Sequence, residues 1–258
     1  MAMYGFNDLK DKIKRYFRFT QEEIKALVIT IIVLSFIVGF NDKSDAFNFS
    51  HWSANLFLVF VIIAIAVMVH ISAQKIIGLS LGYNIEYNIW WAGLIIGLVL
   101  SIVTSALFKG NFSLWLLIPG GIIIHHLTTH RLGYFRYGIN TVSMSIISIA
   151  GPLANILVAT FLWTLQLWFH LFPESYALQQ FILVNWIFAV CTLLPIPPLN
   201  GSKVFFQSRL VFVFVFAFIL GYMFLLIFNI HSFIGAFLIA FVIWLIYWLK
   251  FEQKVLPL

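Results

Sequence analysis

The segment ANLFLVFVIIAIAVMVHISAQKIIGL, residues 54–79, decides the fold class of this chain. It is almost continuously apolar, and a helix needs about 20 such residues to cross the hydrocarbon core of a bilayer. The rest of the chain has the same character, since 62% of its 258 residues are hydrophobic and only 9% are charged. This composition excludes a soluble globular protein with a polar surface. We therefore predict an integral, multi-pass membrane protein.

Other apolar runs reach spanning length. They lie at 24–40, 89–108, 141–169, 179–196, 209–229 and 233–249. A shorter run, 114–124, contains Pro119-Gly120-Gly121 and is too short to cross the bilayer comfortably, so we predict a re-entrant or broken segment there. The predicted fold is an all-α membrane protein, a polytopic helical bundle of about six to eight transmembrane segments.

The basic residues predict the orientation of these spans. If the N-terminus is cytoplasmic, every one of the 15 Lys and Arg residues except Lys43 and Lys109 falls on the inner side. This bias follows the positive-inside rule, and it requires the stretch 80–140 to cross outward and return. Both termini are thus predicted to be cytoplasmic. The net charge of +6 is explained by contact with the anionic inner leaflet, so the expected partner is membrane lipid and not nucleic acid.

The chain is expected to form one membrane domain with four parts. Residues 1–23 form a cytoplasmic, basic, amphipathic N-terminal arm, and residues 24–55 form the first transmembrane helix and an outer loop. Residues 56–206 form the membrane core. Residues 207–258 form the C-terminal transmembrane helices and a short cytoplasmic tail.

Polar side chains inside apolar spans are costly, which makes them the first candidates for a functional site. His70 and Gln74 are four residues apart and share one helical face, with the spacing that metalloproteases use for two zinc-binding histidines. Asn155 ends the motif AGPLAN, and Asn200 lies in LLPIPPLNG. The predicted topology places these segments toward the cytoplasmic half of the membrane at a similar depth.

Two longer motifs carry a family resemblance. SIAGPLANILVA (148–159) and NWIFAVCTLLPIPPLNGSKVFF (185–206) resemble the site-2 protease family of intramembrane zinc metalloproteases. His70 falls at the first histidine of that family and IPGG (118–121) at its Pro-Gly segment, so the resemblance covers about residues 56–206. It implies a site-2-protease-like core. In the family, a His-Glu-x-x-His helix supplies two zinc ligands and a general base, and a later Leu-Asp-Gly supplies the third ligand.

The same resemblance identifies substitutions at the catalytic positions. Ile71 stands at the general base, Gln74 at the second histidine and Asn200 at the ligating aspartate, and Thr192 replaces a usual asparagine. Zinc prefers imidazole, thiolate and carboxylate, so one imidazole with two amides makes a weak site. Ile71 cannot accept a proton from water. We therefore expect no catalytic residue and no cofactor, and zinc at His70, Gln74 and Asn200 is the alternative.

Other groups could replace the missing ligands. Glu86 is the carboxylate nearest to the His70 helix on the predicted inner side, and it is either a relocated base or an ordinary interfacial residue. His126 and His130 in HHLTTH have helical i, i+4 spacing, and they form either a separate metal site or part of an interfacial loop. Without metal, His70 is expected to bond to Gln74, Asn200 or a backbone carbonyl.

The resemblance also implies a substrate groove. Prolines interrupt helical hydrogen bonding and Gly201 allows a tight turn, which leaves backbone groups available. The expected groove residues are Gly120, Gly121, Asn155, Pro195, Pro197, Pro198 and Gly201. The predicted function is a pseudoprotease that binds transmembrane helices of client proteins or of a partner protease. The alternative is an active intramembrane zinc metalloprotease with an atypical site.

Overall fold

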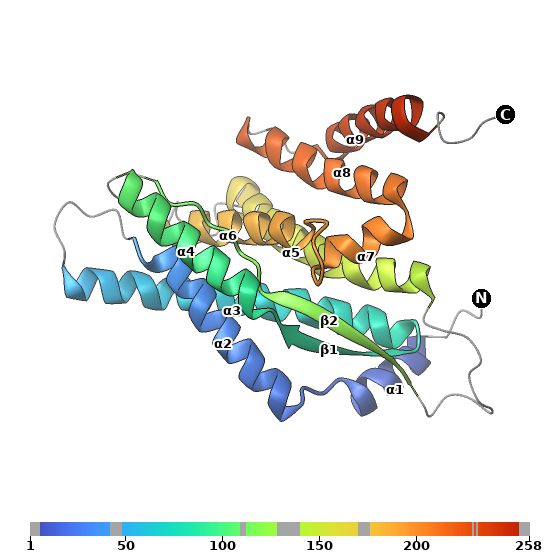
Figure 1. Cartoon of the computed structure of the whole chain (residues 1–258), viewed down its shortest axis with the longest axis horizontal. Helices are drawn as coiled ribbons and strands as arrows, with labels where there is room; N and C mark the ends of the chain where they lie inside the picture. The colour runs from blue at the N-terminus through green and yellow to red at the C-terminus, as the bar shows by residue number, and fades with distance from the viewer. Residues whose placement is uncertain are drawn as a thin grey trace.

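The computed structural model describes residues 6–41, 48–108, 112–127, 140–169, 176–228, 230 and 232–252 (Figure 1). Most of these residues are helical. The helices are α1 (Phe6–Tyr16), α2 (Gln21–Gly39), α3 (Phe49–Ser80), α4 (Trp91–Leu107), α5 (Thr141–Phe169), α6 (Tyr176–Thr192), α7 (Asn200–Gln207), α8 (Arg209–Ile227), α9 (Phe233–Tyr247) and the π-helix η2 (Trp248–Glu252). The strands are β1 (Tyr83–Ile89) and β2 (Gly120–His126).

Among the described residues, four helical segments are long and apolar enough to cross a membrane. They are Phe49–Ser80, Thr141–Gln166, Arg209–Leu226 and Phe233–Glu252, and the shorter apolar helices α4 and α6 accompany them. The prediction of a multi-pass membrane protein is supported by these helices. The number of six to eight spans stays a prediction, since α2, α4 and α6 do not meet the same criteria of length and composition.

A two-stranded antiparallel sheet in the described residues corrects the all-α prediction. Strand β2 includes the end of the run 114–124, which is therefore extended and pairs with β1 from Tyr83↔His126 to Ile89↔Gly120. A glycine is needed at position 120 for two reasons. Its φ is +155°, which side-chain-bearing residues rarely adopt, and a Cβ atom there would collide with the Asn88 carbonyl. Strand pairing satisfies backbone groups that an isolated broken segment would leave unpaired.

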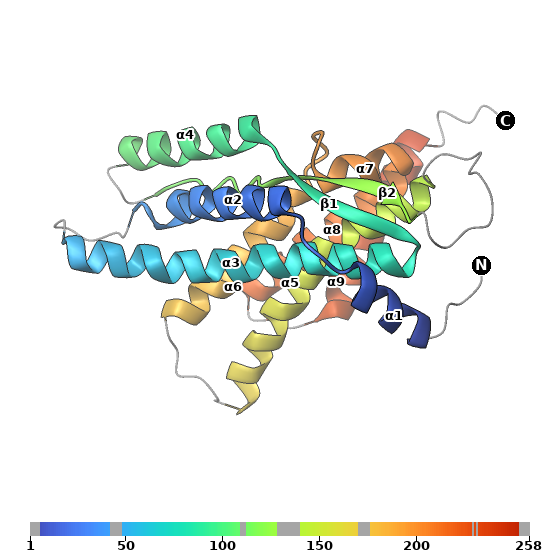
Figure 2. The same ribbon diagram turned by 90° about the horizontal axis from the view of Figure 1, so that it is seen from below.

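Residues 83–108 and 112–127 run in opposite directions along the bundle. Figure 2 shows α4 extending from the end of β1 toward the end of the molecule where α3 begins, with residues 112–126 returning beside it. Small residues allow α4 to lie close to residues 112–126, which we call the return segment, and to α2. A Cβ atom on Gly97 would lie 2.4 Å from the Leu116 carbonyl, and Ser101 Oγ donates to the Ile37 carbonyl at 2.7 Å.

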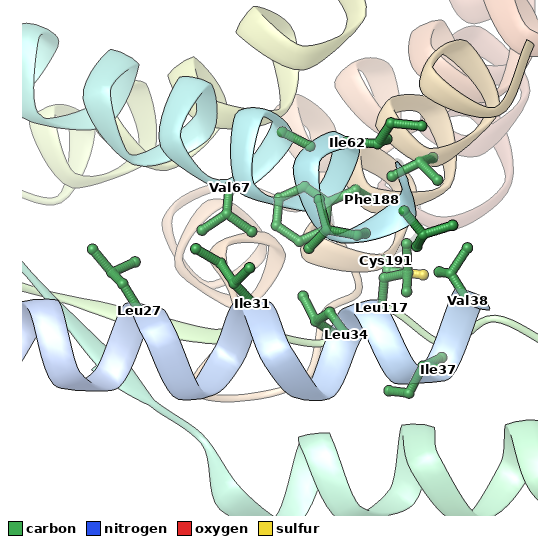
Figure 3. Close-up of a cluster of buried hydrophobic side chains, with 14 of the residues drawn as sticks. Leu27, Ile31, Leu34, Ile37, Val38, Ile62, Val67, Leu117, Phe188 and Cys191 are labelled. Carbon is green, nitrogen blue, oxygen red and sulfur yellow. The ribbon is translucent and has the colours of Figure 1, made fainter. Parts of the chain in front are cut away.

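The largest buried cluster lies between α2, α3 and α6 (Figure 3). Leu34 and Ile63 contribute side chains without exposed surface, and Phe188 from α6 and Leu117 from the return segment close the cluster. A smaller cluster packs the inner face of the sheet, through Ile85 and Ile122, against Ile147 of α5. The sheet is thus fixed over the C-terminal part of α3 and the beginning of α5.

A buried ion pair ties α2 to α3 and β1. Lys75 Nζ lies 2.9 Å from Glu23 Oε1, and both side chains are 3% exposed. The same carboxylate accepts the backbone N–H of Tyr87 at 2.8 Å and that of Thr20 at 3.0 Å. Lys75 also donates to the Arg18 carbonyl at 3.0 Å. This network anchors the outer edge of β1 and the end of the N-terminal arm to the same point of α3.

Candidate functional site

The candidate site begins where α3 and α5 touch. A Cβ atom on Gly151 would lie 2.5 Å from His70 Nε2, so the imidazole rests directly on the α5 backbone. Four residues along α5, Asn155 Nδ2 donates to the Ala66 carbonyl at 3.3 Å. The two contacts define an antiparallel register in which position 70 faces 151 and position 66 faces 155. By helical periodicity, the next turn brings Gln74 opposite residues 147 and 148.

Asn200 completes the surroundings of His70. Its Nδ2 lies 2.9 Å from His70 Nε2, although the two residues are far apart in sequence. The Phe188 ring packs edge-on against the imidazole with 5.2 Å between centroids. Asn200 is held there because α7 begins at this residue, and a Cβ atom on the next residue, Gly201, would collide with the Leu193 carbonyl. Of the three partners expected for His70 without metal, which were Gln74, Asn200 or a backbone carbonyl, the structure shows Asn200.

Several buried polar atoms around this contact have no hydrogen-bond partner within the described part of the chain. They are His70 Nδ1, both amide atoms of Gln74, Asn200 Oδ1 and Ser148 Oγ. Gln74 and Ser148 have no exposed surface, and His70 and Asn200 are 2% and 3% exposed. Buried polar groups without partners are costly. Their clustering marks a polar interior between α3, α5 and α7, composed of uncharged amides, a hydroxyl and one imidazole.

The expected groove residues divide into a buried and an exposed group. Gly121 of β2 faces the loop between α6 and α7, since a Cβ atom there would lie 2.4 Å from the Pro198 carbonyl. Pro195, Pro197 and Pro198 are exposed in that loop, and the Pro197–Pro198 bond is cis. Lys203 Nζ donates to the same Pro198 carbonyl at 3.2 Å. The structure thus brings the Pro-Gly segment beside the proline-rich step, while Asn155 lies apart from them in the α3–α5 contact.

The two remaining family positions are structural in this chain. Ile71 is 3% exposed and belongs to the core cluster shared with Phe188 and Leu117. Thr192 Oγ donates to the carbonyls of its own helix, at 2.9 Å for Phe188 and 3.1 Å for Ala189. Neither side chain takes part in the polar contact between His70 and Asn200.

Glu86 and His126 do not join His70. Glu86 lies on the outer face of β1, with its Oε2 3.6 Å from His125 Nε2, and both side chains are partly exposed. His126 packs against the Tyr83 ring with 5.0 Å between centroids. His130 lies outside the described residues. Within those residues, no group of three His, Cys, Asp or Glu side chains could hold a metal ion, so a site at 125–130 gains no support.

The residues around His70 do not fit zinc. The Nε2 atom of the one imidazole already bonds to an amide, and the other candidate ligands, Gln74 and Asn200, are neutral amides. Zinc sites use imidazole, thiolate or carboxylate ligands, and a hydrolytic site adds a group that accepts a proton from water. A metal at this position would need ligands that differ from those the fold presents.

Ser148 and Gly151 are parts of the site that the sequence motifs contain but that were not predicted as site residues. Ser148 opens the motif SIAGPLAN, and its position three residues before Gly151 places both on one face of α5. Helical periodicity applied to this motif could have indicated both residues. The contacts of Glu23 with Lys75 and Tyr87 could not be indicated in this way, because these two partners lie on separate segments far from Glu23 in sequence.

Comparisons with known proteins agree with a metalloprotease-like membrane protein. The chain is 30% identical over 206 residues to a protein of Methanocaldococcus jannaschii named "Putative zinc metalloprotease MJ0611", and the match covers 77% of this chain and 91% of the relative. No family profile and no solved structure matches the chain. With this identity over most of both sequences, the chain belongs to the family of membrane metalloprotease-like proteins that this archaeal relative represents.

Proposed function

We propose that this chain is a site-2-protease-like membrane protein that does not cleave peptides and instead binds transmembrane segments of client proteins or of a partner protease. One observation carries the proposal: the 2.9 Å contact between His70 Nε2 and the Asn200 amide, with Ile71 buried in the core beside it. Where the resemblance expects three ligands and a base, the chain has His70 bonded to the neutral amide of Asn200, a second neutral amide at Gln74 and the aliphatic Ile71. Such a set retains a polar interior, but its general-base position is the aliphatic Ile71, so the His70 imidazole is the one proton acceptor in it and would also have to serve as a zinc ligand.

The sheet and the proline-rich loop supply a surface for binding an extended client segment. The outer edge of β1 is occupied, because the Tyr87 N–H donates to Glu23. The other edge of β2 has no strand partner among the described residues, and β2 lies beside the exposed loop that contains Pro195 and Pro198. A client helix that unwinds locally could add a strand at this edge, where backbone hydrogen bonds supply affinity. This role rests on analogy of fold.

The second candidate is an active intramembrane zinc metalloprotease with an atypical site. The printed name of the archaeal relative favours it. It requires at least one further ligand and a proton acceptor near His70, which the described residues do not provide there. The two candidates therefore differ in zinc content and in the fate of a bound client.

The test combines site-specific photocrosslinking with metal analysis. A photoreactive residue replaces Ile196 in the proline-rich loop, and the matched control replaces Phe237 on α9, which is similarly exposed at 51% against 45%. We expect intact single-span membrane proteins to crosslink at position 196 and not at 237. Equal crosslinking at both positions would contradict the binding role.

Zinc per protein, measured by elemental mass spectrometry on protein purified without a histidine tag, separates the two candidates. Near-stoichiometric zinc that is lost in His70→Ala, together with cleaved clients at position 196, would establish the protease alternative. Zinc far below one per chain, unchanged in His70→Ala, supports the non-proteolytic reading.

A further inference from the structure

A pocket of about 600 Å³ lies between α1 and the outer face of the β1–β2 sheet. Its walls come from the N-terminal arm, from β1 and from the end of β2. The lining residues are Arg15, Tyr16, Arg18, Asn84, Glu86, His125, His126 and Leu127. The volume is in the range of small-molecule sites, and the pocket lies apart from the polar interior around His70.

The lining is rich in hydrogen-bond donors. Two guanidinium groups, Arg15 and Arg18, offer the planar donor pairs that match the oxygens of a phosphate group. Tyr16, Asn84 and the two histidines add further hydrogen-bond donors. Among the described lining residues the only carboxylate is Glu86, which is 3.6 Å from His125. This chemistry selects an anion with several oxygen acceptors.

The two arginines can turn toward a ligand at little cost. Arg15 pairs with Asp11 at 3.0 Å, but the two side chains are 68% and 59% exposed, and such surface pairs contribute little to stability. Arg18 is also exposed, while its backbone carbonyl is held by Lys75 at 3.0 Å. The backbone at this corner of the pocket is therefore fixed, and the arginine side chains can exchange partners.

The position of the pocket indicates the source of the anion. Helix α3 ends at Ser80, and a turn at Leu81 and Gly82 leads directly into β1, so the pocket lies at the end of a membrane-spanning helix. This is the level of lipid headgroups. Helix α1 is amphipathic, with exposed Lys10 and Lys14 beside half-buried Leu9 and Ile13, as expected of a helix that lies in the membrane interface.

We propose that this pocket binds the phosphate headgroup of an anionic phospholipid. Arg15 and Arg18 hold the phosphate, the further donors on β1 and β2 contact its remaining oxygens, and the acyl chains extend along the apolar surface beside α3. Basic residues at this depth are attracted to an anionic leaflet. The bound lipid would join the N-terminal arm to the sheet.

The test uses the full chain in a neutral detergent and follows its thermal unfolding midpoint, which rises when a ligand binds the folded state. The ligands are dioctanoyl phosphatidylglycerol, dioctanoyl phosphatidylcholine, which has the same chains but no net charge, and inorganic phosphate. We expect saturable stabilisation by phosphatidylglycerol alone. Equal stabilisation by phosphatidylcholine, or by inorganic phosphate, would overturn the assignment to an anionic lipid.

Matched charge variants test the site itself. The double variant Arg15→Gln with Arg18→Gln removes two positive charges that line the pocket. The matched double variant Lys10→Gln with Lys14→Gln removes two positive charges from the exposed face of α1. We expect affinity for phosphatidylglycerol to fall by about tenfold or more in the first variant and by a much smaller factor in the second. An equal loss of affinity in both double variants would mean that the overall positive charge of the N-terminal arm attracts the lipid. That result would overturn the proposal that this pocket binds the headgroup.

Glu86→Gln provides a test that misfolding cannot imitate. Removing the carboxylate that opposes the phosphate should tighten phosphatidylglycerol binding by about threefold, because a like-charge repulsion is lost. Unchanged or weaker binding by a folded Glu86→Gln protein would contradict the proposed position of the headgroup.

Discussion

Gly151 illustrates how single residues determine the site. Its missing side chain lets the His70 ring lie on the α5 backbone, with three imidazole atoms within 2.7 Å of the position that a Cβ atom would occupy. The substitution Gly151→Ala must push α5 away or turn the imidazole from Asn200. Overpacking of this kind costs about 1–3 kcal/mol of folding free energy. Unfolding of the protein in mixed micelles measures this loss.

A suitable control for this substitution is Gly221→Ala on α8. The nearest atom to a Cβ there is Ile239 Cγ2 at 3.1 Å, which is farther away than the three imidazole atoms at Gly151. We expect a clearly smaller loss of stability than at position 151. Equal losses would mean that the contact between His70 and Gly151 is not the source of the effect.

The amide positions allow a gain-of-function prediction. Gln74→His combined with Asn200→Asp would give α3 and α7 the imidazole and carboxylate ligands that zinc prefers, around the existing His70. We expect this double variant to retain about one zinc per chain through purification, and the native chain to retain much less. Elemental mass spectrometry makes the comparison. Similar zinc in both proteins would refute our account of the donor set.

At the residue scale, the sequence could predict some side-chain contacts and not others. The sequence indicated Asn200 as one of three alternative partners of His70, and the structure contains that contact. The orientation of Ile71 into the core and the pairing of Glu86 with His125 depend on how α3 and β1 rotate against their neighbours. The order of polar and apolar residues in the sequence does not specify these rotations.

At the scale of elements, the ion pair between Glu23 and Lys75 joins three segments. Removing one partner leaves a buried charge without compensation, which costs about 3–5 kcal/mol. We expect Lys75→Met to lose stability of this order, and Glu23→Gln combined with Lys75→Met to recover part of it. Denaturant unfolding of the single and double variants measures the difference.

The exposed pair of Asp11 and Arg15 is the control for this prediction. Its side chains are more than half exposed, so Asp11→Asn should change stability by about 1 kcal/mol or less. If Lys75→Met were as mild as Asp11→Asn, the buried pair would not hold β1 in place.

Strand β2 shows which elements the sequence could not predict. The apolar runs 54–79, 141–169, 209–229 and 233–249 correspond to the helices that are long enough to cross a membrane, because length and hydropathy suffice to specify them. The run 114–124 has the same hydropathy, yet its end is a strand because β1, about thirty residues earlier in sequence, supplies its hydrogen-bond partners. Glu23 in turn occupies the other edge of β1. Pairing between segments that are distant in sequence therefore determines that residues 120–126 form a strand.

At the scale of the whole molecule, the positive-inside pattern gives a testable orientation. Cys191, the single cysteine of the chain, is buried in α6, and Cys191→Ser provides a background for cysteine labelling. Lys14→Cys and Lys250→Cys should react with an impermeant maleimide only after cells are permeabilised, and His51→Cys should react in intact cells, because basic residues gather on the cytoplasmic side. All three positions are exposed. Labelling of positions 14 and 51 from the same side would contradict the orientation.

The buried pair of Glu23 and Lys75 also bears on how the molecule responds to heat. Hydration of charged groups becomes less favourable as temperature rises, so the cost of keeping this pair away from water decreases. The apolar contacts that hold the other helices gain no comparable advantage. On warming, the junction of the N-terminal arm, α3 and β1 should consequently be among the last parts of the chain to open, and amide hydrogen exchange at Tyr87 should be protected to higher temperatures than exchange in α9.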